Sequence, residues 1–145
     1  MRKLLGAMAM VLALTMTALA APPVSRDTPA LSKTLINARY VYVTSYDGNQ
    51  FNPAILPDDR QAISAVQDAL QKSKKFVLVY SPREADIVLM VQSRPSEDAL
   101  AVYDARGWPG NGMYLWRVMG RDGLQKNETP LVTEFLQALD RAAKN

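Results

Sequence analysis

Residues 61–91 read QAISAVQDALQKSKKFVLVYSPREADIVLMV, and the pattern in this stretch predicts the fold. In its first part, apolar residues recur at steps of three and four, which is typical of an amphipathic helix of about four turns. These residues are Ile63, Val66, Ala69 and Leu70. Two apolar runs follow, at 76–80 and 87–91, each too short for a helix and rich in strand-forming residues. The stretch therefore predicts one helix and then two strands.

Turn and capping residues separate these elements. Asp58 stands at the predicted helix start with Gln61 three residues later, which is the spacing of a capping box. We interpret Asp58 and Asp59 as helix-start residues that favour the helix dipole, rather than as a catalytic carboxylate pair. Residues 81–84, Ser-Pro-Arg-Glu, predict a single helical turn, and Asp86 before the second strand is interpreted as turn chemistry.

Working outward, the sequence predicts further strands at 39–44, 100–103 and 113–119, and a last helix that begins at Thr129-Pro130. Residues 38–145 then form a single domain in the order strand, helix, four strands, helix. We predict an α/β (or α+β) two-layer sandwich, with a mixed five-stranded sheet and two helices. Only the first helix has connections long enough for a parallel crossover, and the later short links favour antiparallel neighbours.

The N-terminal residues predict export. A cationic start at Arg2 and Lys3, an apolar run and the small-residue triplet at 18–20 are the layout of a secretory signal peptide over 1–20, cleaved between Ala20 and Ala21. The alternative, an uncleaved membrane anchor, would need roughly 20 apolar residues, and the run is shorter. Residues 21–37 are expected to be an extended N-terminal segment. The expected location is the periplasm or the medium, with membrane contact only through the signal peptide before cleavage.

The composition excludes several kinds of chemistry. The 145 residues include neither His nor Cys, which excludes disulfides, thiol catalysis, haem attachment, zinc-finger spacings and a cysteine-borne lipid anchor. Without Arg2 and Lys3 the net charge falls from +3 to +1. A nucleic-acid partner is not expected, because the only tight basic group, at 72–75, lies at a predicted helix end where cations favour the dipole.

The predicted sheet poses a question of coverage. Five strands spaced about 4.8 Å apart form a sheet roughly 20 Å wide, and two helices about 10 Å across cover one face of it. The predicted strands and their ends are rich in aromatic residues, namely Tyr40, Tyr42, Phe76, Tyr80, Tyr103, Tyr114 and Trp116. We expect the second face to be covered by the N-terminal segment, by a second copy in a homodimer or by a partner. In the alternative interpretation, the two helices lie on opposite faces.

The loop at 104–112 is the other candidate surface. Arg106, Trp108 and Asn111 offer a cation, a flat apolar plate and an amide on a glycine-rich tip, a combination suited to glycans, peptides or a protein partner. Alternatively, Trp108 folds back onto the sheet and the glycines only turn the chain. Together with Tyr40, Tyr42 and Trp116 of the sheet, these three residues are the candidate binding residues.

No catalytic motif stands out in the sequence. It has no EF-hand spacing and no phosphate-cradling glycine motif, and it predicts neither catalytic residues, nor a metal site, nor a cofactor. We therefore expect a small exported binding or scaffold module of the cell envelope, whose partner is a protein or another envelope component. The alternative is a carboxylate-based hydrolase acting on a cell-envelope polymer, with Asp104 beside Arg106 as its site.

Residues 61–91 also resemble a family of small envelope domains. A helix of the form A-x-x-x-V-x-x-A-L, a strand, a P-x-E-A-D turn and a second strand are similar to the N-terminal domain of the periplasmic Tol-system translocation protein and to domains of the curli-secretion type. The resemblance implies a role in envelope assembly or protein contacts rather than turnover. The chain departs from those proteins in having no propeller domain after this segment and no lipid-bearing cysteine before it.

Overall fold

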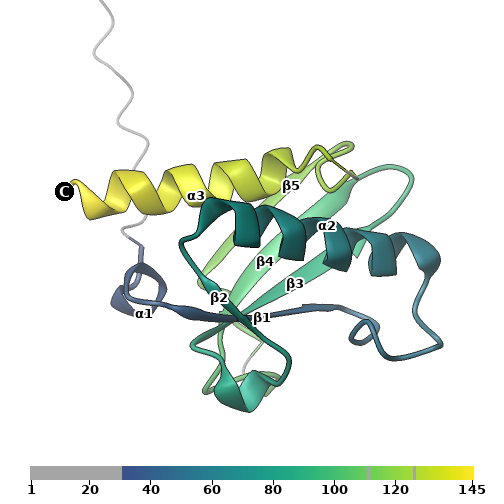
Figure 1. Cartoon of the computed structure of the whole chain (residues 1–145), viewed down its shortest axis with the longest axis horizontal. Coiled ribbons are helices and arrows are strands. Elements are labelled where there is room, and N and C mark those ends of the chain that lie inside the picture. Colours follow the sequence, from purple (N-terminus) through teal and green to yellow (C-terminus); the bar gives the residue numbers. More distant parts are fainter. Residues whose placement is uncertain (1–30, 111, 126) are drawn as a thin grey trace, which may run out of the picture.

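The computed structural model describes residues 31–110, 112–125 and 127–145, and Figure 1 shows their arrangement. The elements in chain order are α1 (Lys33–Ile36), β1 (Tyr40–Ser45), α2 (Pro57–Ser73), β2 (Val77–Val79), the 3-10 turn η1 (Pro82–Glu84), β3 (Ile87–Ser93), β4 (Asp98–Asp104), β5 (Trp116–Gly120) and α3 (Pro130–Ala143). The predicted signal peptide and its cleavage site lie outside the described residues.

The five strands form one mixed sheet in the order β2-β1-β3-β4-β5. β1 pairs in parallel with both β2 and β3, whereas β4 pairs antiparallel with β3 and with β5. The predicted fold class and element order are therefore confirmed. The expectation that the later short links join antiparallel neighbours is confirmed for β3–β4 and β4–β5. It is wrong for the link through η1, because β2 and β3 both run parallel to β1 and lie on either side of it.

Two local predictions need correction. Asp58 does not cap α2: the N-cap residue is Leu56, Pro57 opens the helix, and no side chain caps it. Within the segment expected to be extended, α1 forms one helical turn, because the Ser32 side chain accepts a hydrogen bond from the amide of Leu35. Leu35 is fully buried, so this turn belongs to the domain core.

Both long helices lie across the same side of the sheet (Figure 1), which the buried contacts confirm. Val66 of α2 and Phe135 of α3 share one apolar core with Val43 of β1 and Leu89 of β3. Such burial of alternate strand residues against two helices is what holds a two-layer domain together. The interpretation with one helix on each face is therefore wrong.

A buried carboxylate, Asp59, connects helix α2 to the sheet. Asp59 in the first turn of α2 is fully buried; it accepts hydrogen bonds from the amide of Ser93 at 2.9 Å and from the guanidinium of Arg94 at 2.9 and 3.1 Å. Arg94 also reaches Asp47 at 3.1 Å. Asp59 is thus a structural anchor between α2 and β3, and the side-chain polar atoms buried in the described part of the chain all have partners.

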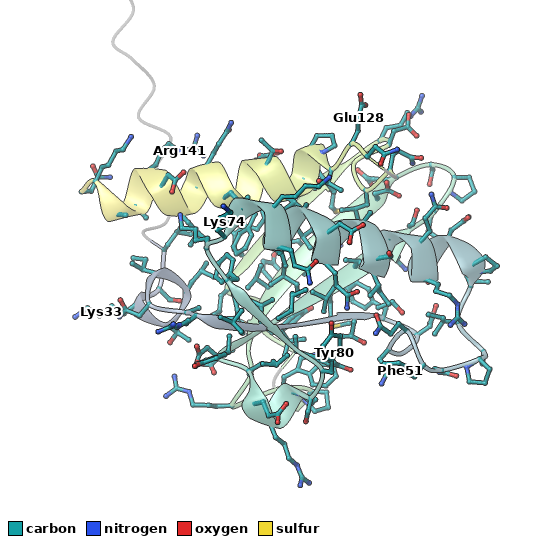
Figure 2. All side chains as sticks on the ribbon, in the orientation of Figure 1. Lys33, Phe51, Lys74, Tyr80, Glu128 and Arg141 are labelled. Atoms are coloured by element: carbon teal, nitrogen blue, oxygen red, sulfur yellow. The ribbon has the colours of Figure 1, made fainter. Side chains whose placement is uncertain are left out.

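The basic group at 72–75 lies at the C-terminal end of α2, where Figure 2 shows Lys74. Lys74 is the C-cap residue, in the left-handed conformation with φ of 56°, and Lys75 pairs with Asp140 of α3. The position of these cations at the helix end is as the sequence predicts, and the pair of Lys75 with Asp140 also joins α2 to α3. Among the described residues, none of the helices combines the length and the hydropathy that crossing a membrane requires.

Candidate functional site

The side of the sheet turned away from α2 and α3 is lined by alternate strand residues. The strand register aligns Tyr42 with Val88 and Val88 with Tyr103, and in the next row aligns Met90 with Ala101 and Ala101 with Arg117. We call this side the aromatic face; its residues are Tyr40, Tyr42, Thr44, Val77, Val79, Val88, Met90, Ala99, Ala101, Tyr103, Arg117 and Met119. Tyr42, Val88 and Met90 form a second buried cluster, separate from the core under the helices.

Trp108 covers the centre of the aromatic face. Its ring meets that of Tyr42 edge to face, with the centroids 6.2 Å apart, and its indole N–H points at the sulfur of Met90 at 3.3 Å. The loop between β4 and β5 therefore folds back onto the sheet. As a result, Tyr42 and Met90 are only 7% and 9% exposed although no helix covers them.

Large apolar side chains remain exposed around Trp108. Six of them lie on the aromatic face or contact it: Tyr40, Tyr46, Val77, Met113, Tyr114 and Met119. Met113 is the most exposed at 79%, and Tyr114 lies under the guanidinium of Arg117, 5.9 Å from the ring centroid. Aromatic residues, Met and Arg are the types enriched in binding interfaces, so this surface has the composition of a contact site.

Tyr103 lies on the aromatic face between the residues that Trp108 covers and the exposed apolar side chains. Burial, and then a hydrogen bond with Tyr46, raises the pKa of Tyr103 to about 12. The phenol therefore stays neutral at physiological pH. A neutral phenol both donates and accepts hydrogen bonds, so the face offers polar recognition as well as apolar area.

An ion pair stands at the end of β4, where Asp104 aligns with Ile87, a residue of the core under the helices. Arg106 donates to Asp104 from Nε at 3.1 Å and from Nη2 at 2.8 Å, and Nη2 also reaches the hydroxyl of Thr34 at 3.4 Å. The hydrogen bonds from the Arg106 side chain hold the pKa of Asp104 below its ordinary value. Asp104 therefore remains ionised.

This chemistry does not favour Asp104 as the general acid of the hydrolase alternative. A carboxyl group that serves as a general acid needs a raised pKa. The pKa of Asp104 is lowered, and so is that of nearby Asp86, chiefly because Asp86 accepts hydrogen bonds from the amides of Tyr40 and Arg39. In the described ranges, no group of three or more acidic side chains is arranged to hold a metal ion.

The structure brings together some of the candidate residues and separates others. Tyr40, Tyr42 and Trp108 lie on the aromatic face, whereas Arg106 pairs with Asp104 at the end of β4 and reaches Thr34 of α1. Trp116 points to the opposite side and packs on Phe135, with the ring centroids 5.3 Å apart. Asn111 lies outside the described residues.

Sequence reasoning missed Tyr46 and Arg117. Tyr46 follows β1, where strand alternation has ended, and it meets the face through Tyr103. Arg117 can be found only from the parity of β5, because the side chains of a strand alternate between its two faces.

A cavity of about 770 Å³ lies elsewhere, along α2. Its lining includes the small residues Ser64, Ala65 and Ala69, together with Pro53 and Thr129. The guanidinium of Arg60 at its edge is engaged by the carbonyls of Gln50 and Asn52. Among the described residues, the lining contains one carboxylate, Asp68, and the cations Arg60 and Lys72.

No protein-family model matches the chain, and neither does any curated protein. Among solved structures, it is similar to a PelC dodecamer from Paraburkholderia phytofirmans, with 18% identity and a TM-score of 0.39 over 70% of this chain and 86% of that one. The resemblance of residues 61–91 to Tol-system and curli-type envelope domains stays a prediction.

Proposed function

We propose that this protein is an exported binding module of the cell envelope, and that the aromatic face is its contact surface. The observation that carries the proposal is the division of the sheet: both long helices cover one side, while exposed aromatic and methionine side chains gather on the other. A monomeric protein rarely exposes such a cluster without a binding role.

Exposed apolar side chains are unfavourable in water, so burying them against a partner would favour binding. Tyr114, Met113 and Met119 are 51%, 79% and 45% exposed, and each would gain free energy from burial against a partner, roughly 25 cal/mol per Å² of apolar surface. The hydroxyl of a tyrosine can form a hydrogen bond with a partner. A tyrosine side chain also has few rotatable bonds, so fixing it on binding costs little conformational entropy.

The proposed location follows from the signal-peptide pattern. We expect the protein recovered from the periplasmic fraction or from the medium to begin at Ala21, as N-terminal sequencing or intact mass measurement would show. A chain that keeps residues 1–20 and stays with the membrane fraction would contradict export by cleavage.

Site-specific photo-crosslinking tests the surface. A benzoylphenylalanine at Tyr114 or Met119 should yield crosslinked adducts in intact cells, because both positions lie on the proposed contact surface. The matched control is Gln137, which is exposed on α3 on the opposite side. Adducts from Gln137 and none from the two face positions would overturn the proposal.

A further inference from the structure

A cavity of about 200 Å³ lies between the β4–β5 loop and the end of β4, where Tyr103 is the residue of the aromatic face in its lining. We infer that this cavity binds one neutral sugar ring of an envelope glycan, with the rest of the glycan lying across the aromatic face. The inference rests on the proposed function, because it names the chemical class that the same surface would bind.

The walls of the cavity suit a ring with apolar faces. Trp108 and Tyr103 supply aromatic plates, Pro109 adds a flat aliphatic ring, and Met113 and Leu115 close the sides. A pyranose presents a C–H face that packs on such plates and hydroxyl groups around its edge. Sites of this kind combine a mostly apolar lining with a few placed polar groups.

The charged group in the lining is Asp104, and its pairing with Arg106 sets the charge that the site prefers. The carboxylate accepts three hydrogen bonds from Arg106, at 3.0, 3.1 and 2.8 Å, which leaves part of its acceptor capacity free. The Arg106 side chain is 80% exposed. It donates to Asp104 and Thr34 through Nε and Nη2, so the hydrogens on Nη1 are available to a ligand. Neighbouring hydroxyls on a sugar can donate to the carboxylate and accept from the guanidinium.

The balance of charge favours a neutral ring over a charged one. Asp104 is the only charged residue in the described lining of the cavity, and Arg106 already neutralises it. A cationic ligand would therefore meet a carboxylate that is already paired. An anionic ligand would meet Asp104, whose lowered pKa keeps it ionised.

Size limits the ligand to one ring in the cavity. Pockets that enclose drug-sized molecules measure roughly 300 to 1,000 Å³, and this one is smaller. Further sugar residues would lie outside it, where Tyr114 and Met113 are exposed. Oligomers of the sugar should therefore bind more tightly than the monomer.

The chain contains two tryptophans, and their placement provides the test. Trp108 forms part of the cavity wall, whereas Trp116 packs on Phe135 beneath α3. In the mature chain carrying Trp116→Phe, the remaining indole should report binding through a saturable change in fluorescence. The probes are glucose, N-acetylglucosamine and their β-1,4-linked tetramers. The reciprocal Trp108→Phe variant should show no such change.

The Asp104→Asn substitution sharpens the test. It retains the shape of the side chain and removes the charge, so we expect about tenfold weaker binding of the tetramers, as for the loss of a charge-assisted hydrogen bond. The matched control is Asp140→Asn on α3, which also breaks a carboxylate–cation pair, with Lys75, and should leave binding unchanged. Circular dichroism would confirm that each variant is folded.

The outcomes separate this inference from the proposed function. If none of the sugars changes the Trp108 signal while crosslinks at Tyr114 persist, the sugar site is wrong and the binding surface stands. Tighter binding of galacturonate or glucosamine than of the neutral sugars would also overturn the inference. If neither the sugars nor the crosslinkers give a signal, both proposals fail.

Discussion

The indole of Trp108 packs edge to face on the phenol of Tyr42, with the ring planes at 70°, and this contact closes the side of the sheet that the helices leave uncovered. The geometry is the one preferred by aromatic pairs, because a ring edge carries positive and a ring face negative partial charge. The loop between β4 and β5 is therefore both a cover for the sheet and a wall of the proposed sugar site.

The first prediction concerns this contact. Trp108→Ala should lower the free energy of unfolding by about 2 kcal/mol, below the roughly 3 to 5 kcal/mol of a fully buried tryptophan, because Trp108 is half-buried. Urea denaturation measures the change. Trp116→Ala serves as the comparison: it should also destabilise the fold, yet leave sugar binding intact. Equal loss of binding in both folded variants would show that Trp108 acts only through stability.

The second prediction concerns Asp59. Asp59→Ala should lower the free energy of unfolding by about 3 kcal/mol, because it leaves the amide of Ser93 and the guanidinium of Arg94 without their buried acceptor. The adjacent Asp58 is exposed and serves as the control, since Asp58→Ala should change stability little. Similar urea midpoints for the two variants would contradict the anchoring role of Asp59.

The third prediction concerns acid stability. The amides of Tyr40 and Arg39 donate to Asp86 and lower its pKa below the model-compound value of 3.8. The stability from this carboxylate is therefore complete above pH 3.8 and is lost as the pH falls through the folded-state pKa. Asp86→Ala should destabilise the protein at pH 7 and flatten the loss of stability as the pH falls below 4. If the free energy of unfolding of the variant depends on pH as that of the unmodified protein does, Asp86 does not provide this acid-sensitive stability.

The fourth prediction concerns Tyr103. Its pKa is raised from 10.0 to about 12, so the folded state retains a proton that the unfolded chain loses. The corresponding stability is present below pH 10 and is lost as the pH rises toward 12. In a spectrophotometric titration at 295 nm, one tyrosine should ionise near pH 12, and Tyr103→Phe should remove that step. A variant that retains it would assign the raised pKa to another residue.

The candidate site could be predicted only in part. Trp108 and Arg106 stand out as residues of a glycine-rich loop, and Tyr40 and Tyr42 as aromatic residues of a strand. The sequence could not predict that the side chain of Trp116 points away from the other candidate residues. Its orientation depends on the register of β5 against β4, in which Trp116 aligns with Val102. A shift of one residue in register would turn Trp116 toward the opposite face.

The sequence by itself determined the order of the elements and the amphipathic character of both long helices, because these depend on periodicity among residues a few positions apart. Only the tertiary structure decided that α2 and α3 share one side, that β1 lies between β2 and β3, and that Trp108 covers Tyr42. These features join residues distant along the chain, such as 42 and 108. The free energy gained by packing favours this arrangement, and that gain comes from contacts between the helices, the sheet and the loop rather than from neighbours along the chain.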